Sequence, residues 1–217
     1  DRLKDDFVST VTHELRTPLT SIRAFSEILV DNPDLDTEER QRFLVPIVEE
    51  TERLTRLINQ VLDLAKLESG AAEWHIEPVD VRAVVESSVS TTAQLFRDRN
   101  VALDIDFPET VPPVAADPDR VAQVMVNLLG NAVKFADPEQ GRVRVGVSVL
   151  DGEVQVDVED NGTGIPEEDR AIIFDKFRQG GDTHRDRPSG TGLGLPISRE
   201  IIDHLGGRMW AADRPGP

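Results

Sequence analysis

Apolar residues recur at the three- and four-residue spacing of a helix through the first thirty residues and again through a second stretch of similar length. The segment DNPDLD at residues 31–36 separates the two stripes, because Pro33 has no amide hydrogen and Asp36 is a good N-cap. The second stripe ends at Gly70, a residue type that suits a helix C-terminus. The pattern predicts a helical hairpin over residues 1–70.

A lone helical hairpin would expose its apolar stripes to water. Two hairpins that pair would bury these stripes in a four-helix bundle, so we expect a homodimer. The chain also begins directly on helical sequence, DRLKDDFVS, with no capping residue before it. We therefore expect the first helix to continue from an upstream sensor domain that lies outside this chain.

The pattern changes from Ala71 onward, where short alternating stretches and helical stripes follow one another. The expected elements are strands in WHIEPVDV and VALDIDF, helices over residues 81–99, 118–135 and 192–205, and a hairpin of RVRVGVSVL with EVQVDVE around Asp151-Gly152. This order predicts an α+β layer, a mixed sheet with helices on one face, as a second domain over residues 71–217.

Charge and composition narrow the functions that this protein can have. Lys and Arg number 24 and Asp and Glu 41, a net charge of −17, which disfavours binding to nucleic acid or to an anionic membrane surface. Cysteine is absent, which fits a cytoplasmic protein and excludes disulfides. Against this acidic background, a cluster of basic residues between Lys176 and Arg187 indicates either an anion-binding segment or simply solvated charges.

The stretch VTHELRTPLT places a histidine beside a carboxylate and a proline inside a predicted helix. His13 shares the polar side of that helix with Thr17, so its imidazole is expected to be exposed. Glu14 can accept a proton from one ring nitrogen, which makes the other a better nucleophile. Pro18 should kink the helix. The alternative is an ordinary solvated histidine.

Two stretches further along could bind a nucleotide. In NLLGNAVKF, Asn127 and Asn131 share one helix face, and amide oxygens suit Mg²⁺, whereas Lys134 suits a phosphate. The alternative is a pair of solvated asparagines. In DNGTGIP, Asp160 follows a strand and Gly162 permits a tight turn, so the carboxylate could accept the amine of adenine.

Two more stretches complete the set. The phenylalanines of FDKFRQ, residues 174–179, could anchor a loop or simply pack in the core. The glycines of GTGLGL, residues 190–195, precede a helix and would present free amides to phosphate. The surrounding elements and the glycine spacing differ from the dinucleotide fingerprint. Each stretch alone is a weak signal, but all four in this order are specific.

These stretches resemble the N, G1, F and G2 boxes of sensor histidine kinases, whose ATP-binding domain has a Bergerat-type fold. The first part of the chain resembles the dimerisation and histidine-phosphotransfer domain of the same family. The family's H-box, H-E-[LF]-[RK]-T-P-L, matches residues 13–19 without a departure. The resemblance covers nearly the whole chain, although the chain ends at ADRPGP, before the family's usual last strand.

The resemblance implies roles for individual residues in binding ATP and Mg²⁺. Asn131 would hold Mg²⁺, Asn127 would support the phosphates and Asp160 would bind adenine. The other positions carried over are Lys134, Phe135, Gly162, Gly164, Ile165, Gly190, Thr191, Gly192, Leu193 and Gly194, together with Arg178 in a lid over residues 178–189.

The resemblance also implies a reaction. His13 would take the γ-phosphate of ATP and pass it to an aspartate of a response-regulator receiver domain, within or between subunits. Glu14 and Thr17 match an E-x-x-T pattern that the family associates with dephosphorylating that partner. Two alternatives are a hydrolytic ATPase, which would need a Glu in place of Asn127, and a non-catalytic dimeric scaffold, which would have no need of His13.

Overall fold

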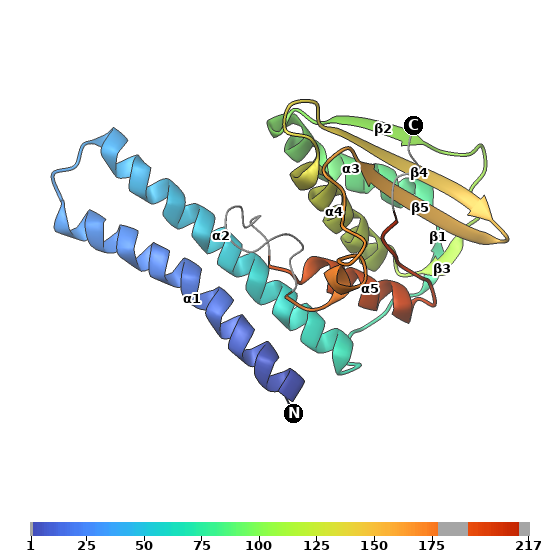
Figure 1. The fold of residues 1–217 in the computed structure, drawn as a ribbon, viewed down its shortest axis with the longest axis horizontal. Helices are drawn as coiled ribbons and strands as arrows, with labels where there is room; N and C mark the ends of the chain where they lie inside the picture. Colours follow the sequence, from blue (N-terminus) through green and yellow to red (C-terminus); the bar gives the residue numbers. More distant parts are fainter. Residues whose placement is uncertain (1, 178–190, 213–217) are drawn as a thin grey trace.

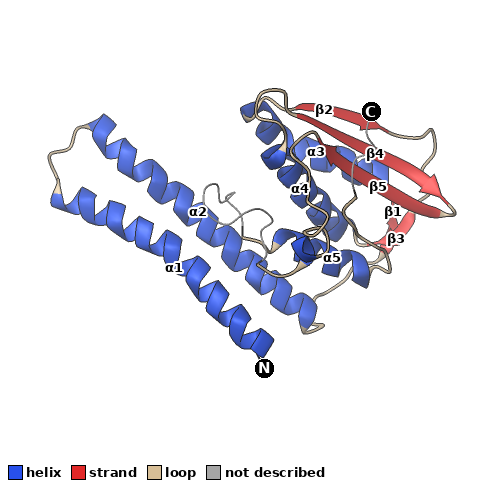
Figure 2. Cartoon of the chain, in the orientation of Figure 1, coloured by secondary structure: helices blue, strands red, loops and turns tan. Residues whose placement is uncertain are grey.

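The computed structural model describes residues 2–177 and 191–212, with side chains described from residue 8 onward (Figures 1 and 2). The helices are α1 (Arg2–Asp31), α2 (Thr37–Glu68), α3 (Val81–Asp98), α4 (Pro118–Phe135) and α5 (Gly194–His204), with a short 3₁₀ helix η1 (Ile172–Phe174). The strands are β1 (Glu77–Val79), β2 (Ala102–Asp106), β3 (Val114–Ala116), β4 (Arg142–Leu150) and β5 (Glu153–Asp160). No helix within the described ranges has the length and apolar character to cross a bilayer.

Helices α1 and α2 form the predicted hairpin, and they run side by side in Figure 1. Asp36 caps α2 through a reciprocal capping box: its Oδ1 accepts the Glu39 amide at 2.8 Å, and the Glu39 carboxylate accepts the Asp36 amide at 3.3 Å. At the other end, Gly70 has a φ of +70°, which glycine adopts without strain. Both ends of α2 therefore follow from local sequence signals.

The second part of the chain has the predicted α+β arrangement. Strand β2 pairs parallel to β4, β4 pairs antiparallel to β5, and β1 pairs antiparallel to β3 in a separate ribbon. Helices α3 and α4 cover one face of the larger sheet (Figure 1), and the core between them contains Val85, Leu129, Val143 and Val145. The short strand β3 was not predicted.

The last third of α2 packs against the second part of the chain. Leu57 and Leu64 are buried in one apolar cluster with Leu193 and Ile201, which belong to the loop before α5 and to α5 itself. The hydrophobic pattern assigned the whole α2 stripe to a helical bundle. The structure divides that stripe, since its C-terminal end is buried within the same chain against α4 and α5.

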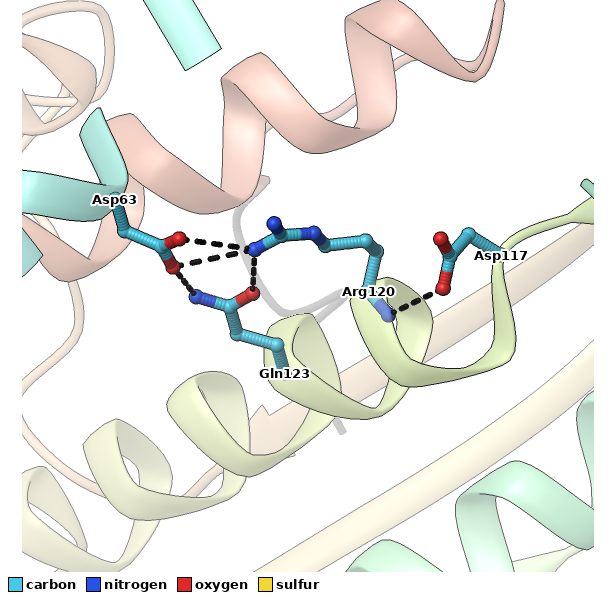
Figure 3. A network of polar contacts seen from close by, with 4 residues as sticks. All are labelled: Asp63, Asp117, Arg120 and Gln123. Carbon is cyan, nitrogen blue, oxygen red and sulfur yellow. Dashed lines mark hydrogen bonds and ion pairs between the residues drawn. The ribbon is translucent and has the colours of Figure 1, made fainter. Parts of the chain in front are cut away.

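A network of polar contacts also joins α2 to α4 (Figure 3). Asp63 on α2 accepts hydrogen bonds from Arg120 Nη1 at 3.1 Å and from Gln123 Nε2 at 2.5 Å, both on α4. The Arg120 guanidinium also lies 5.7 Å from the ring centre of Trp74. Since Arg120 and Asp63 are both mostly buried, this ion pair fixes α2 against α4 more firmly than an exposed pair would.

Candidate active site

The two asparagines of α4 have different surroundings. Asn127 donates from Nδ2 to the hydroxyl of Ser198 at 2.9 Å, and Ser198 is buried on α5. A Cβ at Gly194 would lie 2.2 Å from the Asn127 side-chain oxygen, so a larger residue there would displace the Asn127 side chain. Asn127 therefore joins α4 to the start of α5. Ser198 was missed in the sequence, because a buried serine in an amphipathic helix carries no motif.

Asn131 lies one turn further along α4 and is partly buried. In the part of the chain that the structure describes, its side chain makes no hydrogen bond, so its amide oxygen is available to a ligand. No group of three His, Cys, Asp or Glu side chains among the described residues could hold a metal ion. A single amide ligand fits Mg²⁺, which commonly takes one or two protein ligands and completes its shell with water and phosphate oxygens.

Lys134 and Phe135 close the C-terminal end of α4. Burial lowers the pKa of the Lys134 ammonium, and the positive charge of Arg99 adds to this effect. The Lys134 nitrogen lies 4.7 Å from the ring centre of Phe135, and that ring is 48% exposed. A partly dehydrated cation beside an accessible aromatic face suits a ligand with both an anionic and a planar group.

The turn after β5 approaches the end of α4 closely. Asp160 Oδ1 accepts the Gly162 amide at 2.9 Å, and a Cβ at Gly162 would lie 1.9 Å from the Phe135 carbonyl oxygen. Glycine is therefore required at this position, and the approach brings Asp160 toward Phe135. Gly164 has a φ of +74°, and Ile165 is 40% exposed. The structure thus groups the predicted adenine-binding residues around one turn.

Asn161 is a further residue of this turn that the sequence argument did not single out. Its Oδ1 accepts the Arg142 amide at 2.8 Å, and its Nδ2 donates to the Gln140 carbonyl at 2.7 Å. It therefore links the end of β5 to the start of β4. Its place inside DNGTGIP was the available signal, because asparagine side chains often bond to nearby backbone in turns.

The glycine-rich stretch enters α5 as predicted. Gly192 has a φ of +66°, and Leu193 is fully buried. Leu193 occupies the N-cap position of α5, where no side chain caps the helix, so amides of the first turn stay open to an anion. Arg178 and Gly190, together with the predicted lid, lie outside the described residues.

His13 is exposed on α1, as the polar helix side predicts. The Thr17 hydroxyl donates to the His13 carbonyl oxygen at 3.3 Å, and Pro18 is fully buried. Among the described residues, no hydrogen bond joins the imidazole to Glu14, because adjacent side chains on a helix point in different directions. The imidazole is therefore reachable from solvent.

The fold and this arrangement of residues around α4 are typical of one class of ATP-binding domain, and the family models agree. Residues 116–217 match the model described as histidine kinase-, DNA gyrase B-, and HSP90-like ATPase. Residues 3–70 match the His Kinase A (phospho-acceptor) domain. The chain belongs to the sensor histidine kinase family.

Curated relatives and solved structures support this assignment. The circadian input-output histidine kinase CikA of Synechococcus elongatus is 35% identical over 95% of this chain and 28% of that protein. Sensor histidine kinase WalK of Bacillus subtilis is 33% identical over 97% of this chain and 34% of that protein. The chain thus spans about a third of these relatives' length.

Two solved structures share the architecture. The histidine kinase AdeS of Acinetobacter baumannii aligns with a TM-score of 0.71 and 26% identity over 88% of this chain and 86% of that chain. The histidine kinase ThkA, solved in complex with the response regulator protein TrrA, aligns with a TM-score of 0.76 and 25% identity over 97% of this chain and 58% of that chain. The hairpin and the α+β part therefore recur together in this family.

Proposed function

We propose that this chain is an ATP-dependent autokinase that phosphorylates His13 and passes the phosphoryl group to an aspartate of a response-regulator receiver domain. Residues 1–70 act as the dimerisation and phosphotransfer domain, and residues 71–217 as the ATP-binding domain. The observation that carries the proposal is the exposed His13 of the family's H-box in the same chain as the ATPase-type domain that contains α4. The Asn131 side chain makes no hydrogen bond to any described residue, so its amide can bind a metal ion.

The reaction is a displacement at phosphorus. One imidazole nitrogen of His13 attacks the γ-phosphorus of ATP, the bond to the bridging oxygen breaks, and ADP leaves. The proton on the other ring nitrogen passes to water, or through water to the Glu14 carboxylate. Catalysis in such a transfer is largely positioning and charge neutralisation. Mg²⁺, held by Asn131, supplies part of that neutralisation when bound.

The remaining residues orient the nucleotide. Lys134 and the turn of residues 191–194 contact the phosphates, while Asp160 and Phe135 bind adenine. Asn127 supports the phosphate loop indirectly, since its amide connects α4 to Ser198 and Gly194. An amide cannot act as a general base, which disfavours a hydrolytic ATPase at this site.

The partners are a second copy of this chain and a receiver domain. Several large apolar side chains are exposed on α1 and α2, which favours pairing of two hairpins. They are Val8, Leu19, Ile28, Val30, Leu44, Val45, Val48, Ile58 and Leu62. A receiver domain as the phosphate acceptor is supported by the ThkA structure, which was solved with a response regulator.

Incubation with ATP labelled at the γ-phosphate tests the function directly. We expect the label to join the protein only when Mg²⁺ is present and to be lost in acid but kept in alkali, as a phosphorus–nitrogen bond behaves. Removing Mg²⁺ with a chelator should abolish labelling. An alkali-labile label, or steady phosphate release without labelled protein, would contradict the proposal.

Thr17 is expected to act in the reverse, dephosphorylating reaction. Its hydroxyl lies one turn from His13 and can orient a water toward the partner's acyl phosphate, an effect of positioning rather than of base catalysis. Thr17→Ala should keep His13 autophosphorylation within about twofold but lose about 90% of the stimulated dephosphorylation of a purified phosphorylated receiver domain.

Thr20→Ala is the matched control for this prediction. The Thr20 hydroxyl also donates to the backbone one turn earlier, to the Arg16 carbonyl at 2.8 Å, on the same exposed side of α1. The control should dephosphorylate the receiver at the parent rate. If Thr17→Ala dephosphorylates the receiver as fast as Thr20→Ala does, the Thr17 hydroxyl has only a structural role in the helix.

A further inference from the structure

Helix α2 contributes a polar side chain to the loop before α5. The Thr191 hydroxyl donates to Gln60 Oε1 at 2.6 Å and accepts the Leu193 amide at 3.3 Å. A hydroxyl has a single proton, so donation to Gln60 directs its lone pairs toward the Leu193 amide. The result is a directed chain of two hydrogen bonds from the start of α5 to α2.

Gln60 sits inside a formed interface rather than on an open surface. Leu57 and Leu64, one turn to either side of it on α2, are buried against the second part of the chain. Asp63 pairs with Arg120 of α4, and Glu68 pairs with Lys176. Residues three and four apart share one helix face, so these contacts hold Gln60 beside Thr191.

The hydrogen bond between Thr191 and Gln60 affects nucleotide binding because it fixes the turn that leads into α5. Few amides of that first turn are open to a phosphate, since Pro196 has no amide hydrogen and the Leu193 amide is taken by Thr191. Gly194 and Leu195 therefore carry the open amides. Their direction depends on the conformation of the turn at Thr191.

We propose that Gln60 of helix α2 is a positioning residue of the nucleotide site: it orients Thr191, and through it the phosphate-binding turn. This inference rests on the proposed function, in which residues 191–194 contact the phosphates. It makes the phosphotransfer hairpin part of the nucleotide site, and it means that α2 affects ATP affinity without touching ATP.

The test measures the affinity of the whole chain for a non-hydrolysable ATP analogue with Mg²⁺, by titration calorimetry. Gln60→Leu removes the acceptor at similar size and should raise Kd about fivefold to tenfold, the effect of one lost hydrogen bond. Thr191→Val should do the same. Because the two side chains act through one contact, the Kd of the double variant should lie within about twofold of the Kd of either single variant.

Kinetics separate positioning from a general loss of structure. In Gln60→Leu, KM for ATP should rise by the same factor as Kd, while kcat for His13 labelling at saturating ATP stays within about twofold of the parent. Thr191→Ser keeps the hydroxyl and should bind like the parent. Asn59→Leu makes the matched change at the adjacent exposed position and should leave Kd unchanged.

The outcomes distinguish this inference from the proposed function. If the parent chain binds the analogue and Gln60→Leu binds it within twofold or more tightly, the positioning role is overturned and the kinase function stands. Fully additive effects of Gln60→Leu and Thr191→Val would also overturn it. A parent chain that binds no analogue would overturn both proposals.

Discussion

His13→Gln should incorporate no detectable phosphate, a loss of at least about a thousandfold in autophosphorylation, because the substitution removes the imidazole that we propose as the nucleophile. Glutamine keeps a polar side chain of similar length but has no basic ring nitrogen. His13 is exposed, so the free energy of unfolding should change by less than about 0.5 kcal/mol. The measurement is labelling with γ-labelled ATP, alongside thermal unfolding.

Two of the other three histidines serve as controls for this result, and the third, His184, lies outside the described residues. His75 and His204 are exposed as well, and the His204 ring stacks on Trp74 with the ring centres 3.9 Å apart. Neither has the H-box surroundings of His13. His75→Gln and His204→Gln should be labelled like the parent. Label that persists in His13→Gln would show that another residue accepts the phosphate.

Asn131→Ala should also abolish autophosphorylation, with a loss of about a hundredfold or more, because it removes the amide that we propose as the protein ligand of Mg²⁺. Asn131→Asp should be as inactive. It replaces a neutral amide ligand by a carboxylate, and its negative charge repels the phosphates. The Asn131 side chain has no hydrogen bond in the described structure, so neither change should lower the unfolding temperature appreciably.

Asn127→Ala is an informative comparison. Its amide joins α4 to Ser198, and removing it leaves a buried hydroxyl without that partner, which should cost about 1 kcal/mol or more of folding stability. Asn127→Ala should therefore lose both stability and activity, whereas Asn131→Ala loses activity alone. Sedimentation should show both variants as dimers. A monomeric Asn131→Ala would contradict the separation of dimerisation from nucleotide binding.

Much of the fold could be predicted because the relevant signals are local. Asp36 caps α2, and Asp117 with Pro118 starts α4, both through contacts within four residues. Asp151 and Gly152 both have positive φ, as the tight hairpin between β4 and β5 requires. Strand β3 was missed because three residues are too few to show a period, and only its pairing with β1 defines it.

The residues proposed for the candidate site also come from local signals in the sequence. The H-box and the four other stretches are short motifs, and the sequence around them predicts that Asn131 lies on a helix and that Asp160 ends a strand, as the structure shows. The sequence could not show that Asn127 bonds to Ser198, 71 residues away, or that Gly162 packs against the Phe135 carbonyl. Such contacts depend on how α4, α5 and the sheet pack.

The sequence by itself determined the hairpin, the α+β order and the residue types of the site, since capping, turn geometry and periodicity act over a few residues. Only the tertiary structure decided where the end of the α2 stripe is buried. Leu57, Leu64 and Gln60 look like bundle positions in the sequence, yet they contact α5 and its preceding loop. Hydrophobic burial is non-directional, so an apolar stripe shows that it needs a partner but not which one.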